Sequence, residues 1–399
     1  RELAIQSANS TNSASDRASL DAEASQLISE ITRVASQTSF NGLNLLDGSF
    51  TAQSFQVGAN ANQTISVNSI ADARSSALGS NILLGQGTVI GANGGVGVTK
   101  AAAADLTGGN TVAVEANLTI ATSAGTTAAF GYNALDDAKA IAAAINLNAS
   151  SIGVTAKATN SATLSGIVSA GTIGMTLNGT AISTNVADPS DLTALVSAIN
   201  GVQGTTGVTA SFTSSSSKTG ITLSTSDGRD ISILDFAHSG ATKTVSFSGV
   251  TLTGGAATDS SIKSGSVTLD SSKGAITLGG ANADAFTTAT QTSTFSSVAS
   301  LSISSSANAQ LAIATIDAAL AQVNVSRGDL GAYQNRFASA IANLQTTAEN
   351  LSASRSRIQD ADFAAETASL TRGQILQQAG TAILAQANSL PNNVLTLLR

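Results

Sequence analysis

The residues best able to do chemistry are a short acidic cluster near the C-terminal end. Asp360, Asp362 and Glu366 lie close together, and carboxylate oxygens are the ligands that hard divalent cations prefer. Arg355 and Arg357 come just before them, so the same carboxylates can form charge pairs along one helix face. We therefore predict a polar helical segment here and no metal site.

A second candidate is the stretch Asp227-Gly228-Arg229-Asp230, followed by the only histidine, His238. A calcium loop needs further oxygen ligands at fixed spacing, which this stretch lacks, so a plain turn is predicted. His238 has no evident catalytic partner and is interpreted as an ordinary surface or strand residue. The motifs G-x-S-x-G, P-loop and HExxH are absent from the sequence. We predict no catalytic, cofactor-binding or metal-binding residues, and hence no enzyme.

The composition excludes several other classes of protein. The 399 residues include 11% charged and 3% aromatic residues, no Cys, and a formal net charge of -7. Phosphate contacts need clustered Lys and Arg, which argues against a nucleic-acid binder. Without Cys there are no disulfides or thiolate metal sites. No apolar run reaches the ~18 residues of a membrane span, and no signal peptide is evident. A structural protein is favoured.

The elements that position these residues divide the chain in three. Residues 1–50 and 300–399 carry Leu, Ile, Arg, Gln and Asn in helical spacing, whereas residues 86–298 are rich in Gly, Ser, Thr, Ala and Val. The middle therefore resembles an insertion between two related ends, with residues 50–85 as a transition. Because Arg1 falls inside a helical pattern, we expect a fragment of a longer chain.

The clearest periodicity is a ladder of apolar residues at alternating spacings of four and three over residues 316–358. Residues 20–34 repeat this spacing, which predicts a coiled-coil seam between two helices, within one chain or between chains. A long helix packed on its own domain is the alternative. Ser15 or Asp16 is expected to cap the first helix. The predicted seam residues are Leu20, Leu27, Ile31, Val34, Leu320, Val323, Leu330, Phe337, Ile341, Leu344 and Leu351.

The periodicity changes to that of strands after residue 40. Phe55 and Val57, then Ile65 and Val67, alternate across a turn at residues 58–63, which predicts a β-hairpin. The middle contains an internal repeat at about 110–165 and 170–232. Each copy is interpreted as a short helix closed by an Ile-Asn pair and followed by a strand.

Several stretches resemble the terminal signatures of the bacterial flagellin family. They are residues 1–9 (RELAIQSAN), 38–48 (TSFNGLNLLDG), 55–67 (FQVGANANQTISV), 330–358 (LGAYQNRFASAIANLQTTAENLSASRSRI), 360–366 (DADFAAE) and 389–399 (SLPNNVLTLLR). The resemblance covers about 1–70 and 305–399. The Ile-Asn pairs of the middle are similar to the flagellin IN motif, which is a weaker signal.

The resemblance implies an α+β multidomain subunit with a long antiparallel helical rod. Its coiled-coil-like domain D1 would comprise 1–85, a helix plus the β-hairpin, and a C-terminal helix at 299–355. Residues 356–399 would form the C-terminal helix of D0, with the N-terminal D0 helix and the first D1 helix missing. Residues 86–298 would form β-rich outer domains (D2/D3-like) containing the two IN-type repeats.

The function implied by the resemblance is that of a structural subunit polymerising into the extracellular flagellar filament after type III export. Implied partners are other copies of the chain, the export chaperone, and the filament cap and hook-junction proteins. The alternatives are a hook-junction protein, or an adhesin whose outer domains bind glycans. No cofactor, nucleic acid or membrane span is expected.

Two sets of contact residues follow from the resemblance. Leu3 and Glu23 match positions of the surface that Toll-like receptor 5 reads in this family. The apolar residues of the C-terminal helix would be buried in the filament core, because an isolated helix cannot bury them. These expected D0 contacts are Phe363, Leu370, Leu376, Ile383, Leu384, Leu390, Val394 and Leu397.

Overall fold

The computed structural model describes two compact units. The first comprises Arg1–Phe50 and Ile70–Arg327, and the second Thr51–Ser69 and Gly328–Arg399. For 390–397 only the helical backbone is described, so the predicted contacts Leu390, Val394 and Leu397 lie outside the described side chains. The described residues are 1–9, 11–58, 62–91, 95–106, 108–214, 216–281, 283–287, 291–359 and 362–397.

Three helical segments form one end of the first unit. They are α1 (Glu2–Ala8), α2 (Ala14–Gln37) and the first part of α7 (Ser306–Gln359). A capping box starts α2: the Ser13 hydroxyl accepts from the Asp16 amide at 3.2 Å, and the Asp16 carboxylate accepts from the Ser13 amide at 2.9 Å. The predicted cap at Ser15 or Asp16 was therefore misplaced, because Ser13 is the N-cap and Asp16 is the third residue of the helix.

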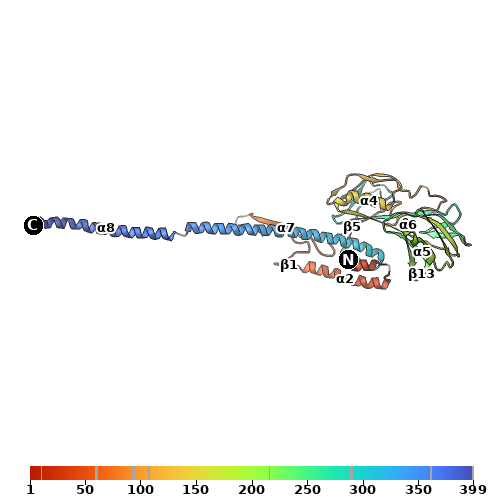
Figure 1. Ribbon diagram of the computed structural model, residues 1–399, viewed down its shortest axis with the longest axis horizontal. Coiled ribbons are helices and arrows are strands. Elements are labelled where there is room, and N and C mark those ends of the chain that lie inside the picture. Colours follow the sequence, from red (N-terminus) through yellow and green to blue (C-terminus); the bar gives the residue numbers. More distant parts are fainter. Residues whose placement is uncertain are drawn as a thin grey trace. The chain divides into compact units, whose positions relative to one another are not determined.

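The prediction of an antiparallel helical rod is wrong for α2 and α7. Leu20 and Ala24 of α2 pack in one cluster with Ile313 and Ile316, and Ile28 packs with Val323. Since contacts advance along both helices together, α2 and α7 run parallel; only α1 opposes them (Figure 1). After the intervening strands, the chain returns to the helical layer at the start of α7, beside the end of α1. There the Ser306 hydroxyl donates to the Ala8 carbonyl at 2.9 Å.

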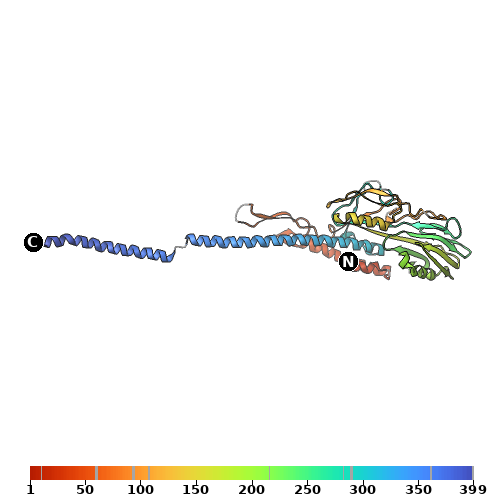
Figure 2. The ribbon, with the colours of Figure 1, turned by 45° about the horizontal axis from the view of Figure 1, so that its top comes forward.

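The second unit contains the predicted hairpin, the rest of α7, and α8 (Phe363–Leu397). The strands β3 (Thr51–Gln56) and β4 (Thr64–Ser69) pair antiparallel, with Phe55 opposite Ile65. Phe55 meets Phe337 of α7 edge to face, with ring centroids 5.5 Å apart, so the hairpin lies on this helix (Figure 2).

The remaining segments build two β-rich lobes within the first unit. One eight-stranded antiparallel sheet runs in the order β12-β13-β9-β18-β5-β20, with β15 and β16 attached through β9. Its strands are β5 (Gly79–Leu84), β9 (Val154–Ser165), β12 (Thr209–Ser214), β13 (Ser217–Thr225), β15 (Thr244–Phe247), β16 (Val250–Thr253), β18 (Ser266–Ser271) and β20 (Thr294–Ser297).

Two four-stranded sheets and the short segment η1 complete the lobes, while η2 packs against α2 and α7, and the pair β1 (Ser39–Phe40) and β2 (Leu43–Asn44) follows α2. One sheet has the order β11-β10-β14-β17; the other joins β19, β7 and β8 to β6. Their bounds are β6 (Glu115–Thr122), β7 (Gly125–Thr126), β8 (Phe130–Tyr132), β10 (Gly171–Leu177), β11 (Thr180–Val186), β14 (Ile231–His238), β17 (Ser261–Lys263), β19 (Thr277–Gly279), η1 (Ser150–Ile152) and η2 (Val298–Ser300).

Each copy of the internal repeat supplies the helix of one lobe. The helix α4 (Ala138–Ala149) covers a core that includes Ile145 and the first half of β9. The helix α5 (Thr193–Gly201), followed by the single turn α6 (Gln203–Thr206), covers a second core that includes Ile199 and the second half of β9. We call these the first lobe and the second lobe; β9 runs through both.

The Asn of each Ile-Asn pair ties its helix to the following strand. The Asn146 side chain accepts from the Ala156 amide at 2.7 Å and donates to the Ala156 carbonyl at 2.8 Å. Asn200 makes the same pair of bonds to Ala210, at 2.7 and 2.9 Å. The amide thus replaces a neighbouring strand, satisfying both backbone groups of a buried residue. The expected role of helix closure is wrong for Asn146, since α4 continues to Ala149.

Gln322 of α7 makes the same pair of hydrogen bonds to a strand of the first lobe. Its side chain accepts from the Gly79 amide at 3.2 Å and donates to the Gly79 carbonyl at 2.9 Å, which joins α7 to β5. In a chain with few charges, neutral amide pairs of this kind connect helix to sheet without the desolvation cost of buried ions.

Candidate functional site

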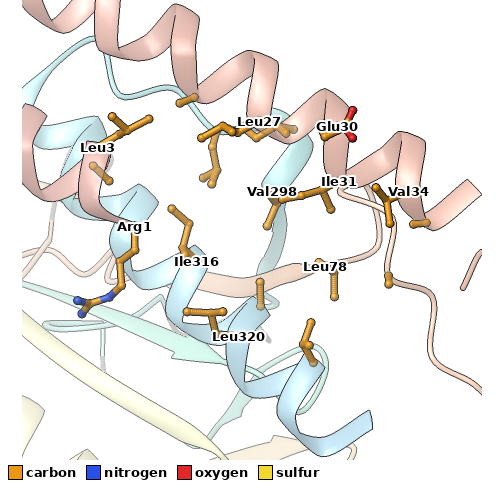
Figure 3. A pocket seen from close by; sticks show the side chains of 18 of the residues that line it. Arg1, Leu3, Leu27, Glu30, Ile31, Val34, Leu78, Val298, Ile316 and Leu320 are labelled. Atoms are coloured by element: carbon orange, nitrogen blue, oxygen red, sulfur yellow. The ribbon is translucent and has the colours of Figure 1, made fainter. Parts of the chain in front are cut away.

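The most apolar candidate site is a groove of about 490 Å³ between α2 and the first part of α7 (Figure 3). Leu27, Ile31 and Val34 reach into it from α2, and Ile316 and Leu320 reach into it from α7. The four-three spacing seen in the sequence puts these residues on one face of each helix. We call this site the assembly groove.

The floor of the assembly groove comes from segments that the periodicity did not indicate. Leu78, Val298 and Ile303 are buried there, and Leu301 and Leu46 also line it. These residues lie in loops and short turns, where a single apolar side chain has no repeating partner to mark it. Only the packing of η2 and its flanking loops under the helices reveals them.

The walls of the assembly groove stay open to solvent. Leu27 is 54% exposed, Ile31 42% and Leu320 49%, although they face a continuous apolar surface. Burying a side chain of this size is worth about 1.5–3 kcal/mol. Because these three side chains are already about half buried, closing the groove over them would contribute on the order of 2–4 kcal/mol, a sizeable fraction of the stability of a domain.

Three charged residues line the assembly groove, Arg1, Asp21 and Glu30, and the Asp21 carboxylate accepts from the Ile303 amide at 2.5 Å. Arg1 forms a bidentate pair with Asp317, with Nε to Oδ1 at 2.5 Å and Nη2 to Oδ2 at 3.0 Å. This hydrogen bond and charge raise the pKa of Arg1 and lower the pKa of Asp317. The pair is about half exposed, so it orients the end of α1 on α7 and adds little stability.

The predicted seam residues do not all come together in one place. Leu20 packs beside Ala309 and Ala312, and Val323 packs with Ala319 at the groove. Phe337 lies against the hairpin, and Leu330 is partly buried. Ile341, Leu344 and Leu351 are exposed. The helix α2 has 24 residues and α7 has 54, so α2 is too short to cover the whole ladder.

The helix α8 carries a second exposed apolar surface. Phe363 is 86% exposed, and the other described candidates of this helix are all more than half exposed, namely Leu370, Leu376, Ile383 and Leu384. Phe363 and Leu370 are seven residues apart and share one side of the helix, whereas Leu376 and Ile383, also seven residues apart, share another side. Soluble monomers rarely expose this much apolar surface, so we expect α8 to be covered on more than one side.

The acidic cluster is part of a helix start. The Asp362 carboxylate accepts from the amides of Ala364 and Ala365, and Glu366 follows in the first turn of α8. Carboxylates are stabilising there because the first helix amides lack partners. Asp360 lies outside the described residues, and no group of three or more metal-binding side chains occurs among the residues that the structure describes.

The other two chemical candidates lie in the second lobe. Asp227 pairs with Arg229, Nη2 to Oδ2 at 2.7 Å, and with Lys139 of α4 at 3.0 Å, and these hydrogen bonds lower the pKa of Asp227. His238 was expected to be an ordinary surface or strand residue; it ends β14 and is buried, and its Nδ1 accepts from the Gly240 amide at 2.9 Å. Both belong to the packing of the lobes. Within the described ranges, no helix meets the length and hydropathy of a membrane span.

Comparisons with known proteins agree on one family. Residues 1–51 match the bacterial flagellin N-terminal helical region, 313–398 the C-terminal helical region, and 174–227 the flagellin hook IN motif. The chain is 37% identical to B-type flagellin of Pseudomonas aeruginosa, covering 100% of this chain and 81% of the relative. It is 35% identical to flagellin of Salmonella choleraesuis, covering 100% and 82%. A solved structure of FliC from Burkholderia pseudomallei is 23% identical, with coverage of 84% and 90% and a TM-score of 0.31.

Proposed function

Because this chain belongs to the bacterial flagellin family and is a structural subunit of the flagellar filament, we propose that its helical segments carry assembly while its lobes do not. The observation that carries this proposal is the distribution of exposed apolar side chains. They gather on facing sides of α2 and α7 and along α8, whereas the lobes enclose their own cores. Large exposed apolar surfaces mark sites of protein–protein contact, so these helices are the surfaces that neighbouring subunits would cover.

The assembly groove is proposed to hold one more flagellin helix. Both relatives extend beyond the region shared with this chain, which covers 81% and 82% of their lengths. We propose that an amphipathic helix from the part of the flagellin polypeptide outside this shared region lies between α2 and α7. The exposed apolar residues of α8 are proposed to contact neighbouring subunits, with the first D0 helix as a further partner.

The remaining roles come from the family. We propose that the subunit is exported by the flagellar type III system and added at the filament tip, with the export chaperone, filament cap and hook-junction proteins as partners. Flagellin relatives spanning the whole chain favour the filament over a hook-junction role. Toll-like receptor 5 recognition through Leu3 and Glu23 is proposed with them: Leu3 lines the assembly groove and Glu23 is exposed on α2.

Deletion of the lobes tests this division. Removing residues 86–291 and joining the ends with a short Gly-Ser bridge keeps β5 and β20, which pair with Ile82 opposite Thr294. The Gln322 bonds to Gly79 are retained too. We expect filaments of normal length and near-normal motility when this variant, in the full-length polypeptide, is the only flagellin of a cell. Electron microscopy and swimming assays give the measurement.

A second variant, which keeps the lobes but disrupts the helical layer, is expected to have the opposite effect on filament formation. Ala312 of α7 is fully buried against the neighbouring helices. The substitution Ala312→Asp therefore places an unpaired charge in the helical layer. Several kcal/mol of destabilisation are expected, and filaments should be lost. Filaments lost in the deletion but retained in Ala312→Asp would show that the lobes, and not the helices, carry assembly.

A further inference from the structure

The two lobes meet at a compact polar junction in the middle of β9. Residues 154–159 of this strand pair with β18, and residues 160–164 pair with β13. The turn between β13 and β14, residues 226–230, packs against the change of partner: a Cβ on Gly228 would lie 2.3 Å from the Ala158 Cβ. We call this region, with Asn110 and the start of α4, the lobe junction.

Side-chain amides bind the turn into both lobes. Asn160 donates to the carbonyls of Arg229 and Lys263, at 3.0 and 2.8 Å. Asn178, from the hairpin of β10 and β11, donates to the Asp230 carbonyl at 2.9 Å. Asn110 donates both to the Asp136 carbonyl and to the Asp230 carboxylate, at 3.1 and 2.7 Å. The segment before α4 and the turn before β14 therefore share a donor.

The Asp230 carboxyl is the unusual member of the lobe junction. Its Oδ2 accepts from Asn110 and the Gly265 backbone amide also favours the charged carboxyl, but its Oδ1 is buried without a hydrogen bond of normal geometry among the described residues. An ionised oxygen in this position lacks the solvation it would have in water. A protonated carboxyl avoids most of that cost, so the neutral form fits the closed junction better.

The neighbouring charges do not compensate for this burial. Lys139 and Arg229 both pair with Asp227, and the buried Lys263 donates to the Gly97 carbonyl. Asp137, the N-cap of α4, repels a charged Asp230, and Asp136 accepts from the Asn133 amide at 2.8 Å. Burial, with this repulsion, raises the pKa of Asp230 to about 7 despite the hydrogen bonds from Asn110 and from the Gly265 backbone amide.

Water has a route to the lobe junction. A cavity of about 540 Å³ lies beside it, lined by Asp136, Asp137, Lys139, Arg229 and Asp230 among others. Ionisation of Asp230 can therefore be relieved by separating the turn from α4 and hydrating the carboxylate from this cavity. We propose that the lobe junction is a pH-responsive joint, closed when the Asp230 carboxyl is protonated and loosened when it ionises.

The direction of the response follows from proton linkage. The closed junction holds a proton up to about pH 7, whereas a solvated carboxyl releases it near the ordinary value of 3.8. Closure is therefore weakened progressively as the pH rises from about 4 to about 7, and stays weak above that. Between pH 5 and pH 8 the opening constant should rise by on the order of 10- to 100-fold.

Hydrogen exchange of the full chain measures this opening. The amides of β9 and β14 beside the junction are followed at pH 5–8, with exchange corrected for its intrinsic pH dependence. We expect the 10- to 100-fold rise in the wild type and a flat, low opening constant in Asp230→Asn. The exposed Asp105→Asn is the matched control and should behave as the wild type. A flat wild-type profile, or the same rise in Asp230→Asn, would overturn the proposal.

A titration that needs no variant guards against a misfolded mutant. In ¹³C spectra of the chain labelled at aspartate carboxyls, one carboxyl should titrate near pH 7. The buried Asp270, whose pKa is also raised by burial, lies in the first lobe with the Ser80 hydroxyl as donor, so loss of the signal in Asp230→Asn assigns it. If every aspartate titrated below pH 6, the joint would not exist.

Discussion

Ile31→Asp is expected to abolish filament formation while leaving the lobes and most of the helical packing folded. Ile31 projects into the assembly groove and is 42% exposed, so a carboxylate there remains hydrated until another helix covers it. In the variant, covering this position forfeits about 1 kcal/mol of apolar burial and buries a charge without a partner, which costs more. A total penalty of about 3 kcal/mol or more corresponds to a critical concentration at least on the order of 100-fold higher.

Gln26→Asp is the matched control for this effect. Gln26 lies on the same helix, is exposed and does not line the groove, yet the substitution introduces the same charge and the same helix propensity. Both variants are compared in the full-length polypeptide by sedimentation of filaments and by thermal unfolding. Equal polymerisation of the two would contradict the role of the groove, and a large fall in Tm for Ile31→Asp alone would assign the residue to folding.

Asn200→Ala is expected to destabilise the second lobe by about 2–5 kcal/mol. The substitution leaves the amide and the carbonyl of Ala210 without their partners, and an unsatisfied buried group costs about 1–3 kcal/mol. The Tm of the lobes should fall by roughly 5–15 °C for a structure of this size. Asn200→Asp should also destabilise, because its carboxylate can accept from the Ala210 amide but repels the Ala210 carbonyl.

Asn148→Ala, in the other copy of the repeat, provides the comparison. Asn148 is exposed on α4 and donates to the Ala144 carbonyl at 2.8 Å, a bond that water can replace. The expected change is within about 0.5 kcal/mol. Calorimetry of the full chain separates the outcomes: if Asn200→Ala and Asn148→Ala shifted the transition equally, the paired bonds to Ala210 would have no special weight.

The sequence determined the helices, the hairpin and the repeats, because each has a local and repeating signal. The spacing of Leu27, Ile31 and Leu320 put them on helix faces, and alternation across residues 55–67 marked the hairpin. Family membership was also legible, since long signatures at both ends occur in order. The Ile-Asn pairs stood out as a repeat, although the partner of each Asn lies ten residues away and has no mark of its own.

The tertiary structure alone decided how these pieces meet. Whether α2 runs with or against α7 depends on where the inserted lobes return the chain, and the period of a helix carries no such information. The floor of the groove, Leu78 and Val298, comes from isolated residues in turns. The sequence predicted only a plain turn at Asp230. The burial of its carboxyl and the incomplete hydrogen bonding arise only when the lobes close around it. Periodicity reports which side of an element is apolar; direction, depth and solvation come from contacts between residues far apart in the chain.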